Sequence, residues 1–285
     1  MKKILLLLAL IVAAFSGCVE EEPSAEDLKT MMIIAGQDIE TVKFTMVTDQ
    51  TTTITNVTDS ETIITDSRGE GEVNMTAQAM KLLMITTSKM GDAENVTMEM
   101  EMYMLGDAFY MKIDGNWTNM TGLLPEGMMD QQNQLKMQME MLNNSRVELE
   151  GSEKIDGQDT YVLKVVPDME AFSATMEKQM GSMPIVGMNL TDIYSSAEME
   201  WTTWLSKDSY LPLEIQVNMK MKMTPEMMGL PVEDVGDFDM LVESDSAVLY
   251  RDYNRPVVIE LPSEAKNATD MSTLLGMTAT APLAE

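Results

Sequence analysis

The residue best suited to chemistry in this sequence is Cys18, the only cysteine among 285 residues. It follows the small residues Ser16-Gly17 and an apolar run from Ile4 to Phe15, and the chain begins Met1-Lys2-Lys3. A short positive segment, about 12 apolar residues and a small-residue junction are typical of a secretory signal peptide, since a membrane-spanning helix needs roughly 20 apolar residues. The sequence therefore predicts an exported protein with a signal peptide at residues 1–17.

The junction Ser16-Gly17-Cys18 resembles the lipobox of bacterial and archaeal lipoproteins, in which the cysteine thiol is lipidated and becomes the first mature residue. Phe15 stands where that motif usually has leucine. The resemblance implies a lipid on Cys18 that anchors the chain to the outer face of the cytoplasmic membrane, with residues 18–23 as lipidated cysteine and acidic tether. An ordinary signal peptide and an uncleaved N-terminal anchor are alternatives, and both also place the remaining chain outside the cytoplasm.

Eight of the twelve asparagines begin an Asn-x-Ser/Thr sequon, more than the Ser and Thr content would produce by chance. Sequons accept N-glycans on the surface of exported proteins, so this excess predicts a glycoprotein. Alternatively, Asn and Thr fall together because the strands are rich in Thr. Archaeal envelope proteins often carry N-glycans, so sequons and lipobox together favour an archaeal cell surface. The sequon asparagines are Asn56, Asn74, Asn95, Asn116, Asn119, Asn143, Asn189 and Asn267.

The composition excludes several classes of function. The net charge is -28, and loss of Lys2 and Lys3 with the signal peptide makes it about -30 (-28 minus 2). Nucleic acid is not an expected partner, because phosphate backbones are bound by clustered Lys and Arg. With no histidine and one cysteine, His-dependent catalytic or metal sites and an internal disulfide are impossible. Carboxylate pairs such as Asp237 and Asp239 are expected among 47 acidic residues. We therefore expect a non-enzyme with no metal and no cofactor.

The hydrophobic periodicity predicts an α+β protein. Ser24 as N-cap and Asp27 in the capping-box position predict a helix that ends before Gly36. From Val42 onward the apolar period is two, which is typical of strands. The pairs Asp114-Gly115 and Asp156-Gly157 predict hairpin turns.

The second half of the chain continues this mixture. Further helices are predicted at 126–142 and after Asp168, and a hairpin at 197–205 and 213–223. Strands are also expected at 240–251 and at 257–261, followed by a loosely ordered tail at 263–285. Since no linker divides the chain, residues 24–262 are predicted to form one domain.

Three sequence segments, together with the order of the predicted helices and strands, resemble the LolA, LolB and LppX/LprG-like lipoproteins. The segments are Lys154 to Val165, Trp204 to Pro212 and Tyr253 to Pro262, and the similarity covers roughly Ser24 to Ala265. The resemblance implies a strongly curved antiparallel β-sheet, a half-barrel, that wraps a few helices around an apolar cavity. It also implies a membrane-anchored extracytoplasmic lipoprotein that binds or carries a hydrophobic lipid ligand.

The chain contains 33 methionines, many at alternate positions of the predicted strands. Methionine is unbranched and polarizable, so a face lined with it adapts to varied acyl or isoprenoid chains. The candidates for a lipid cavity are Met98, Met100, Met102, Met219, Met221 and Met223.

Two alternatives to the lipid cavity remain open. The methionines fill an ordinary core, and the protein is a glycosylated structural or protein-interaction module of the cell envelope. As a lesser alternative, neighbouring thioethers such as Met98, Met100 and Met102 bind Cu(I), although copper carriers commonly add histidine.

Overall fold

The structure is a computed structural model that describes residues 22–122, 141–180 and 190–271. The signal peptide, Cys18, Asn189 and most of the predicted helix at 126–142 lie outside the described residues.

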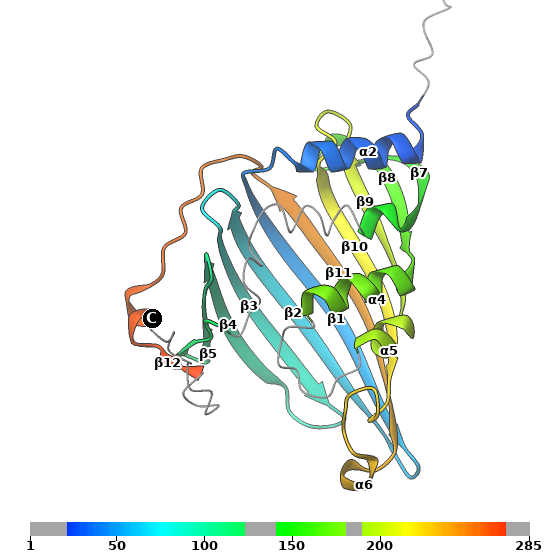
Figure 1. Cartoon of the computed structure of the whole chain (residues 1–285), viewed down its shortest axis with the longest axis vertical. Helices are drawn as coiled ribbons and strands as arrows, with labels where there is room; N and C mark the ends of the chain where they lie inside the picture. The colour runs from blue at the N-terminus through cyan, green and yellow to red at the C-terminus, as the bar shows by residue number, and fades with distance from the viewer. Residues whose placement is uncertain (1–21, 123–140, 181–189, 272–285) are drawn as a thin grey trace, which may run out of the picture.

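The strands of the described residues form a single curled sheet that does not close into a barrel (Figure 1). Its 12 strands follow the order β12-β6-β5-β4-β3-β2-β1-β11-β10-β9-β8-β7, and every neighbouring pair is antiparallel except β12 with β6. The mostly antiparallel, half-barrel-like sheet predicted from the sequence is therefore confirmed. In chain order the strands are β1 (Thr41–Asn56), β2 (Ser60–Asn74), β3 (Ala79–Met90), β4 (Val96–Leu105), β5 (Ala108–Ile113), β6 (Asn116–Asn119), β7 (Ser145–Ile155), β8 (Gln158–Pro167), β9 (Glu198–Ser206), β10 (Pro212–Met223), β11 (Phe238–Arg251) and β12 (Thr269–Asp270).

Helix α2 (Ala25–Gly36) runs across one end of the sheet (Figure 1). It begins at the predicted capping box, because Ser24 Oγ accepts the backbone N–H of Asp27 at 3.2 Å while the Asp27 carboxylate accepts the backbone N–H of Ser24. These two bonds hold the start of α2 in place, and its Leu28 and Met32 side chains pack onto the sheet.

The remaining helices are short. Helix α4 (Met169–Met180) follows the predicted N-cap Asp168, which accepts the backbone N–H of Glu170 at 3.0 Å. Figure 1 shows α4 and α5 (Leu190–Ser195) in front of one face of the sheet. Two further short helices, α6 (Val232–Val235) and the 3-10 helix η1 (Ser263–Asn267), lie in connecting segments.

Both predicted Asp-Gly turns are present. Asp114 and Gly115 have φ angles of 46° and 87° between β5 and β6, and Asp156 and Gly157 have 49° and 83° between β7 and β8. Two consecutive positive φ angles are the geometry of the two-residue type I′ hairpin, and Asp-Gly adopts it at little steric cost.

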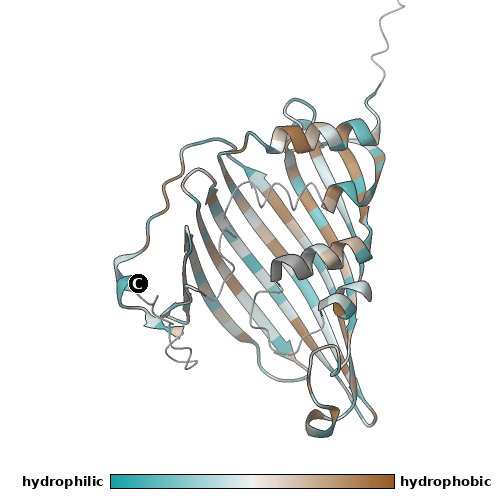
Figure 2. Cartoon of the chain, viewed as in Figure 1, coloured by the Kyte–Doolittle hydropathy of each residue, from teal (hydrophilic) through white to brown (hydrophobic). Residues whose placement is uncertain are grey.

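The two faces of the sheet differ in chemistry. We call the face against which α2 packs the inner face. Its residues include Trp201 of β9, which lies opposite Val165 of β8 and Val217 of β10. The outer face carries the charged side chains, and the alternation along the strands is visible in Figure 2. Five cross-strand ion pairs lie on it, at 2.7 to 3.0 Å: Lys43 with Glu72, Lys112 with Glu101, Lys164 with Glu200, Lys220 with Glu243 and Lys222 with Asp239.

Two apolar clusters occupy the end of the inner face near α2. The first joins α2 to β7, β8 and β9, and its members Leu28, Leu163 and Leu205 are all 0% exposed. The second lies on the same face, over β1, β2, β4 and β5, and contains Val42, Val73, Met104 and Phe109. We call them the leucine cluster and the phenylalanine cluster.

One strand prediction is wrong. Residues Val257–Leu261 alternate like a strand, but no sheet pairing forms there, and the segment runs away from β11 (Figure 1). The cause lies just upstream, where Asp252 and Asn254 adopt positive φ angles and Asn254 Oδ1 accepts the backbone N–H of Glu40 at 2.8 Å. This turn carries the chain off the sheet.

The C-terminal segment predicted to be loosely ordered from residue 263 is structured at its beginning. It forms η1 and then β12, where Thr269 lies opposite Thr118 of β6. Residues 272–285 lie outside the described residues.

Candidate functional site

All six candidate methionines lie on the inner face. Met98, Met100 and Met102 are on β4, where they face Thr86, Met84 and Leu82 of β3. The other three, Met219, Met221 and Met223, are on β10, opposite Ser244, Val242 and Met240 of β11. The sequence therefore placed each triplet correctly on one face of its strand.

The structure does not bring the two triplets together. Strands β3, β2, β1 and β11 lie between β4 and β10, and five spacings between neighbouring strands amount to about 24 Å along the sheet. The two triplets lie on opposite sides of one wide inner face, so the six sulfur atoms do not form a single site.

Exposure of the inner face increases along β4 with distance from α2. Met104, in the phenylalanine cluster, is 8% exposed, Met100 and Met102 are half-buried, and Met98 is 37% exposed. Met90 at the far end of β3 is 48% exposed. The methionines of β10 are also half-buried. Much of the inner face is thus apolar without being a closed core.

Sequence reasoning missed a set of polar side chains in the middle of the inner face. They occupy two adjacent rows across β11, β1, β2 and β3. Several bond one another, including Thr48 with Ser246 at 2.9 Å and Ser67 with Thr86 at 3.0 Å. The set, which we call the polar block, is Ser246, Thr48, Ser67 and Thr86 in one row and Ser244, Gln50, Thr65 and Ser88 in the next.

Two tyrosines border the inner face beside the phenylalanine cluster. Burial raises the pKa of Tyr250 and of Tyr253 above the ordinary value of a tyrosine. The Tyr253 hydroxyl donates to the carbonyl of Pro212 at 2.6 Å, which ties the end of β11 to the start of β10.

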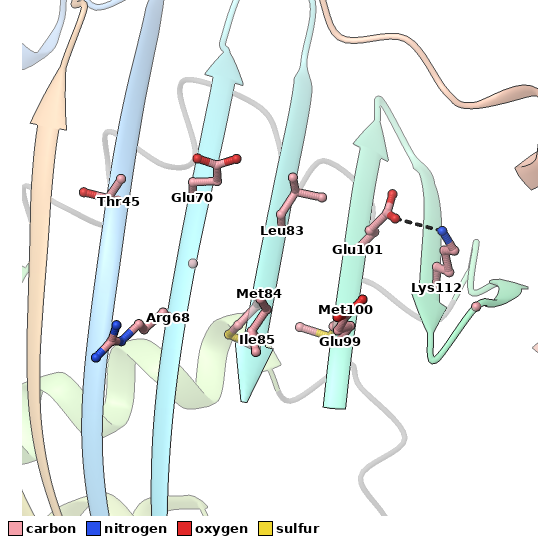
Figure 3. A pocket seen from close by; sticks show the side chains of 12 residues that line it. Thr45, Arg68, Glu70, Leu83, Met84, Ile85, Glu99, Met100, Glu101 and Lys112 are labelled. Atoms are coloured by element: carbon pink, nitrogen blue, oxygen red, sulfur yellow. Dashed lines mark hydrogen bonds and ion pairs between the residues drawn. The ribbon is translucent and has the colours of Figure 1, made fainter. Parts of the chain in front are cut away.

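The outer face has a shallow hollow of different chemistry, about 540 Å³ in volume (Figure 3). Arg68, Glu70 and Leu83 line it, together with Glu101 and Lys112, whose charged groups lie 2.8 Å apart. The hydrogen bond from Lys112 to Glu101 raises the pKa of the lysine. This open, charged hollow does not match the apolar cavity implied by the resemblance.

The acidic residues of the described chain are arranged as a solvated surface. Asp239, one of the carboxylates noted in the sequence, pairs with Lys222 at 3.0 Å. Within the described ranges, no three His, Cys, Asp or Glu side chains are placed to hold a metal ion. Binding of Cu(I) by thioethers alone stays a prediction.

The sequon asparagines divide by accessibility. Asn74 and Asn119 are half-buried, and the Asn74 amide donates to the carbonyl of Val257 at 2.9 Å. Their use as glycan sites stays a prediction. The exposed sequon asparagines are Asn56, Asn95, Asn116, Asn143 and Asn267.

The chain belongs to the family of unknown function DUF6612, which matches residues 24–270. No curated protein matches the sequence. In residues 22–122, 141–180 and 190–271, no helix has the length and apolar content to cross a membrane.

Among solved structures, the chain is similar to LprF from Mycobacterium bovis, with 12% identity and a TM-score of 0.43 over 84% of this chain and 98% of LprF. It is also similar to the lipoprotein LppX from Mycobacterium tuberculosis, with 12% identity and a TM-score of 0.40 over 83% of this chain and 100% of LppX. A LolA superfamily protein from Nitrosomonas europaea shares 10% identity, with a TM-score of 0.23 over 85% of this chain and 96% of that protein.

These solved structures include LppX and a LolA superfamily protein, the groups that the three sequence segments resembled. At such TM-scores and identities, the similarity carries no information about ligand or partner.

Proposed function

We propose that this protein is a membrane-anchored, exported carrier or receptor for a hydrophobic lipid, which binds on the inner face of the sheet. One observation carries the proposal: the inner face of β4 and β10 is apolar, yet all of its methionines except Met104 remain half-buried or exposed. Apolar surface that stays in contact with water is costly, and a ligand that covers it recovers the hydrophobic free energy.

The methionine content supports an adaptable site. A Leu or Val side chain has few rotamers, whereas the unbranched thioether of Met adjusts to acyl or isoprenoid chains of different shape. Helices α4 and α5, in front of the same face, would form the opposite wall of the cavity that the sheet wraps (Figure 1).

The anchor in this proposal is a lipid on Cys18. The N-cap Ser24 stands six positions after Cys18, and a fully extended chain of that length spans about 20 Å. The α2 end of the sheet would then lie close to the membrane surface. The acidic tether has no membrane affinity of its own, so Cys18→Ser should release the protein into the medium or leave it unprocessed. Normal processing and membrane retention of the variant would rule the anchor out.

The binding function is tested with protein freed of co-purified lipid and a fluorescent acyl probe in detergent-free buffer. The wild type should bind the probe. Met221→Glu should bind it at least tenfold more weakly, because the carboxylate must be desolvated or neutralised beside an apolar chain. Met221→Leu should bind like the wild type.

Two controls separate lost binding from lost folding. Gln216→Glu adds the same charge to the exposed outer face of β10 and should leave binding unchanged. Thermal unfolding of each variant shows whether Met221→Glu keeps a folded domain. If the wild type binds no hydrophobic probe, the carrier proposal fails, and the alternative of an envelope module with a filled core replaces it.

A further inference from the structure

The polar block is unusual because of what surrounds it. Its rows meet Met98 and Val96 of β4 on one side, and Val217 and Met219 of β10 on the other. On the side toward α2, the next inner-face row is Val248, Met46, Gly69 and Met84. On the opposite side the next row is Val242, Thr52, Ile63 and Met90, in which Thr52 accepts a hydrogen bond from Gln50 at 3.1 Å. The polar side chains thus lie in the centre of a mainly apolar face.

The block keeps hydrogen-bonding capacity beyond its internal bonds. The block contains three hydroxyl pairs: Thr48 with Ser246, Ser67 with Thr86, and Thr65 with Ser88 at 3.1 Å. Every member of the block except Ser244 is half-buried. A hydroxyl carries one donor and two acceptor positions, so each pair uses one donor and leaves the other O–H free to bond a third group.

The block carries no charge. Its members are Ser, Thr and Gln, and the ion-paired lysines and carboxylates of the same strands point to the outer face. With neighbouring strands about 4.8 Å apart and alternate residues about 7 Å apart, the block measures about 14 by 7 Å. This area is large enough for several oxygen-bearing groups of one ligand.

We propose that the ligand is a neutral lipid whose uncharged oxygen groups, esters or hydroxyls, lie between apolar chains and bond the polar block. The chains would extend toward the methionines of β4 on one side and of β10 on the other. This inference rests on the proposed carrier function and adds the class of ligand. A plain hydrocarbon would cover the block without replacing its bonds to water, and an anionic group would find no cation there.

The test compares three pyrene-labelled probes in detergent-free buffer: a diacylglycerol, the phosphatidic acid with the same chains, and a long alkane. The wild type should bind the diacylglycerol at least tenfold more tightly than the other two. The variant Thr48→Val/Ser246→Ala removes both partners of one pair and keeps their approximate shape, so it should lose most of this preference and still bind the alkane.

A matched control exists on the outer face. Thr87 and Thr97 form the same kind of cross-strand hydroxyl pair at 3.1 Å, and Thr87→Val/Thr97→Val should leave the preference intact. If Thr48→Val/Ser246→Ala fails to fold, Thr65→Val/Ser88→Ala removes a second pair of the block and is read in the same way.

The possible results separate the two proposals. The neutral-lipid inference is overturned by any of three results: equal binding of all three probes by the wild type, tighter binding of phosphatidic acid, or a preference that survives loss of the block hydroxyls. Each of these results leaves the carrier function standing. Binding of none of the probes would overturn the carrier function itself.

Discussion

The two sides of the inner face are built from different side chains. On the side of β7, β8 and β9, Leu163 and Leu205 are 0% exposed under α2, and branched residues fill the space. On the side of β3, β4 and β5, methionines replace them, and exposure rises from 8% at Met104 to 37% at Met98. The leucine cluster is a closed core, whereas the methionine side leaves apolar surface exposed.

The sharpest test of this contrast is truncation on each side. Leu163→Ala leaves a cavity in a fully buried site and should lower the free energy of unfolding by about 2–5 kcal/mol. Met100→Ala removes a half-buried side chain and should cost roughly 1 kcal/mol. Denaturant unfolding measures both. Equal losses would mean that the methionine side is an ordinary core.

The phenylalanine cluster packs the methionine side closely near α2, and substitution of Gly71 tests this packing. A Cβ at Gly71 would lie 2.2 Å from the ring of Phe44, which covers the glycine from the neighbouring strand. Gly71→Ala should therefore cost about 1–3 kcal/mol through overpacking. Adding Phe44→Leu should recover part of that loss, and no recovery in the double variant would contradict the steric cause.

Helix α2 matters to the contrast because it covers the leucine cluster. Ser24→Ala removes its N-cap and should lower stability by about 1 kcal/mol. The hydrogen bonds from Ser24 lower the pKa of Asp27 below its ordinary value of 3.8.

The pH dependence follows from this shift. The bonds of Asp27 stabilise the folded state above pH 3.8, and this contribution is lost as the pH falls through the lower pKa of the folded state. Asp27→Asn should be less stable than the wild type near neutral pH and approach it in acid. A difference that does not change with pH would contradict this origin.

The smallest change in stability is expected for a substitution on the outer face of β1, a strand in the middle of the sheet. Asp49 is directly opposite Asp66 and Asp245, and like charges at opposite positions destabilise a sheet. Asp49→Asn should stabilise the protein by about 0.3 kcal/mol at low salt, less at high salt, and leave probe binding unchanged. Asp239→Asn, whose carboxylate pairs with Lys222, is the control and should not stabilise.

Local signals in the sequence predicted much of the fold. The capping box of Ser24 and Asp27 and the Asp-Gly turns depend on neighbours in the chain, so their residues were enough to find them. The prediction of a strand at Val257–Leu261 was wrong because its alternation is local, whereas the bond between Asn254 and Glu40 joins residues 214 apart.

The site was only partly predictable for the same reason. The methionine triplets follow from alternation within one strand. The polar block appears only when β1 pairs with both β2 and β11, which aligns Thr48 with Ser67 and with Ser246, 198 residues along the chain. Single strands give no sign that their hydroxyl groups meet.

The open sheet leaves β7 as the last strand in the order of the described part of the chain. A long unpaired edge is a template for another strand, and an unclosed barrel therefore risks joining edge to edge with a second copy. Gly151, with a φ of 145°, places a bulge in β7, and Arg146, Glu148 and Lys154 put charges along it. A bulge and charges along an edge strand disfavour pairing with a second copy of the chain, so we expect them to keep the unclosed sheet from extending edge to edge.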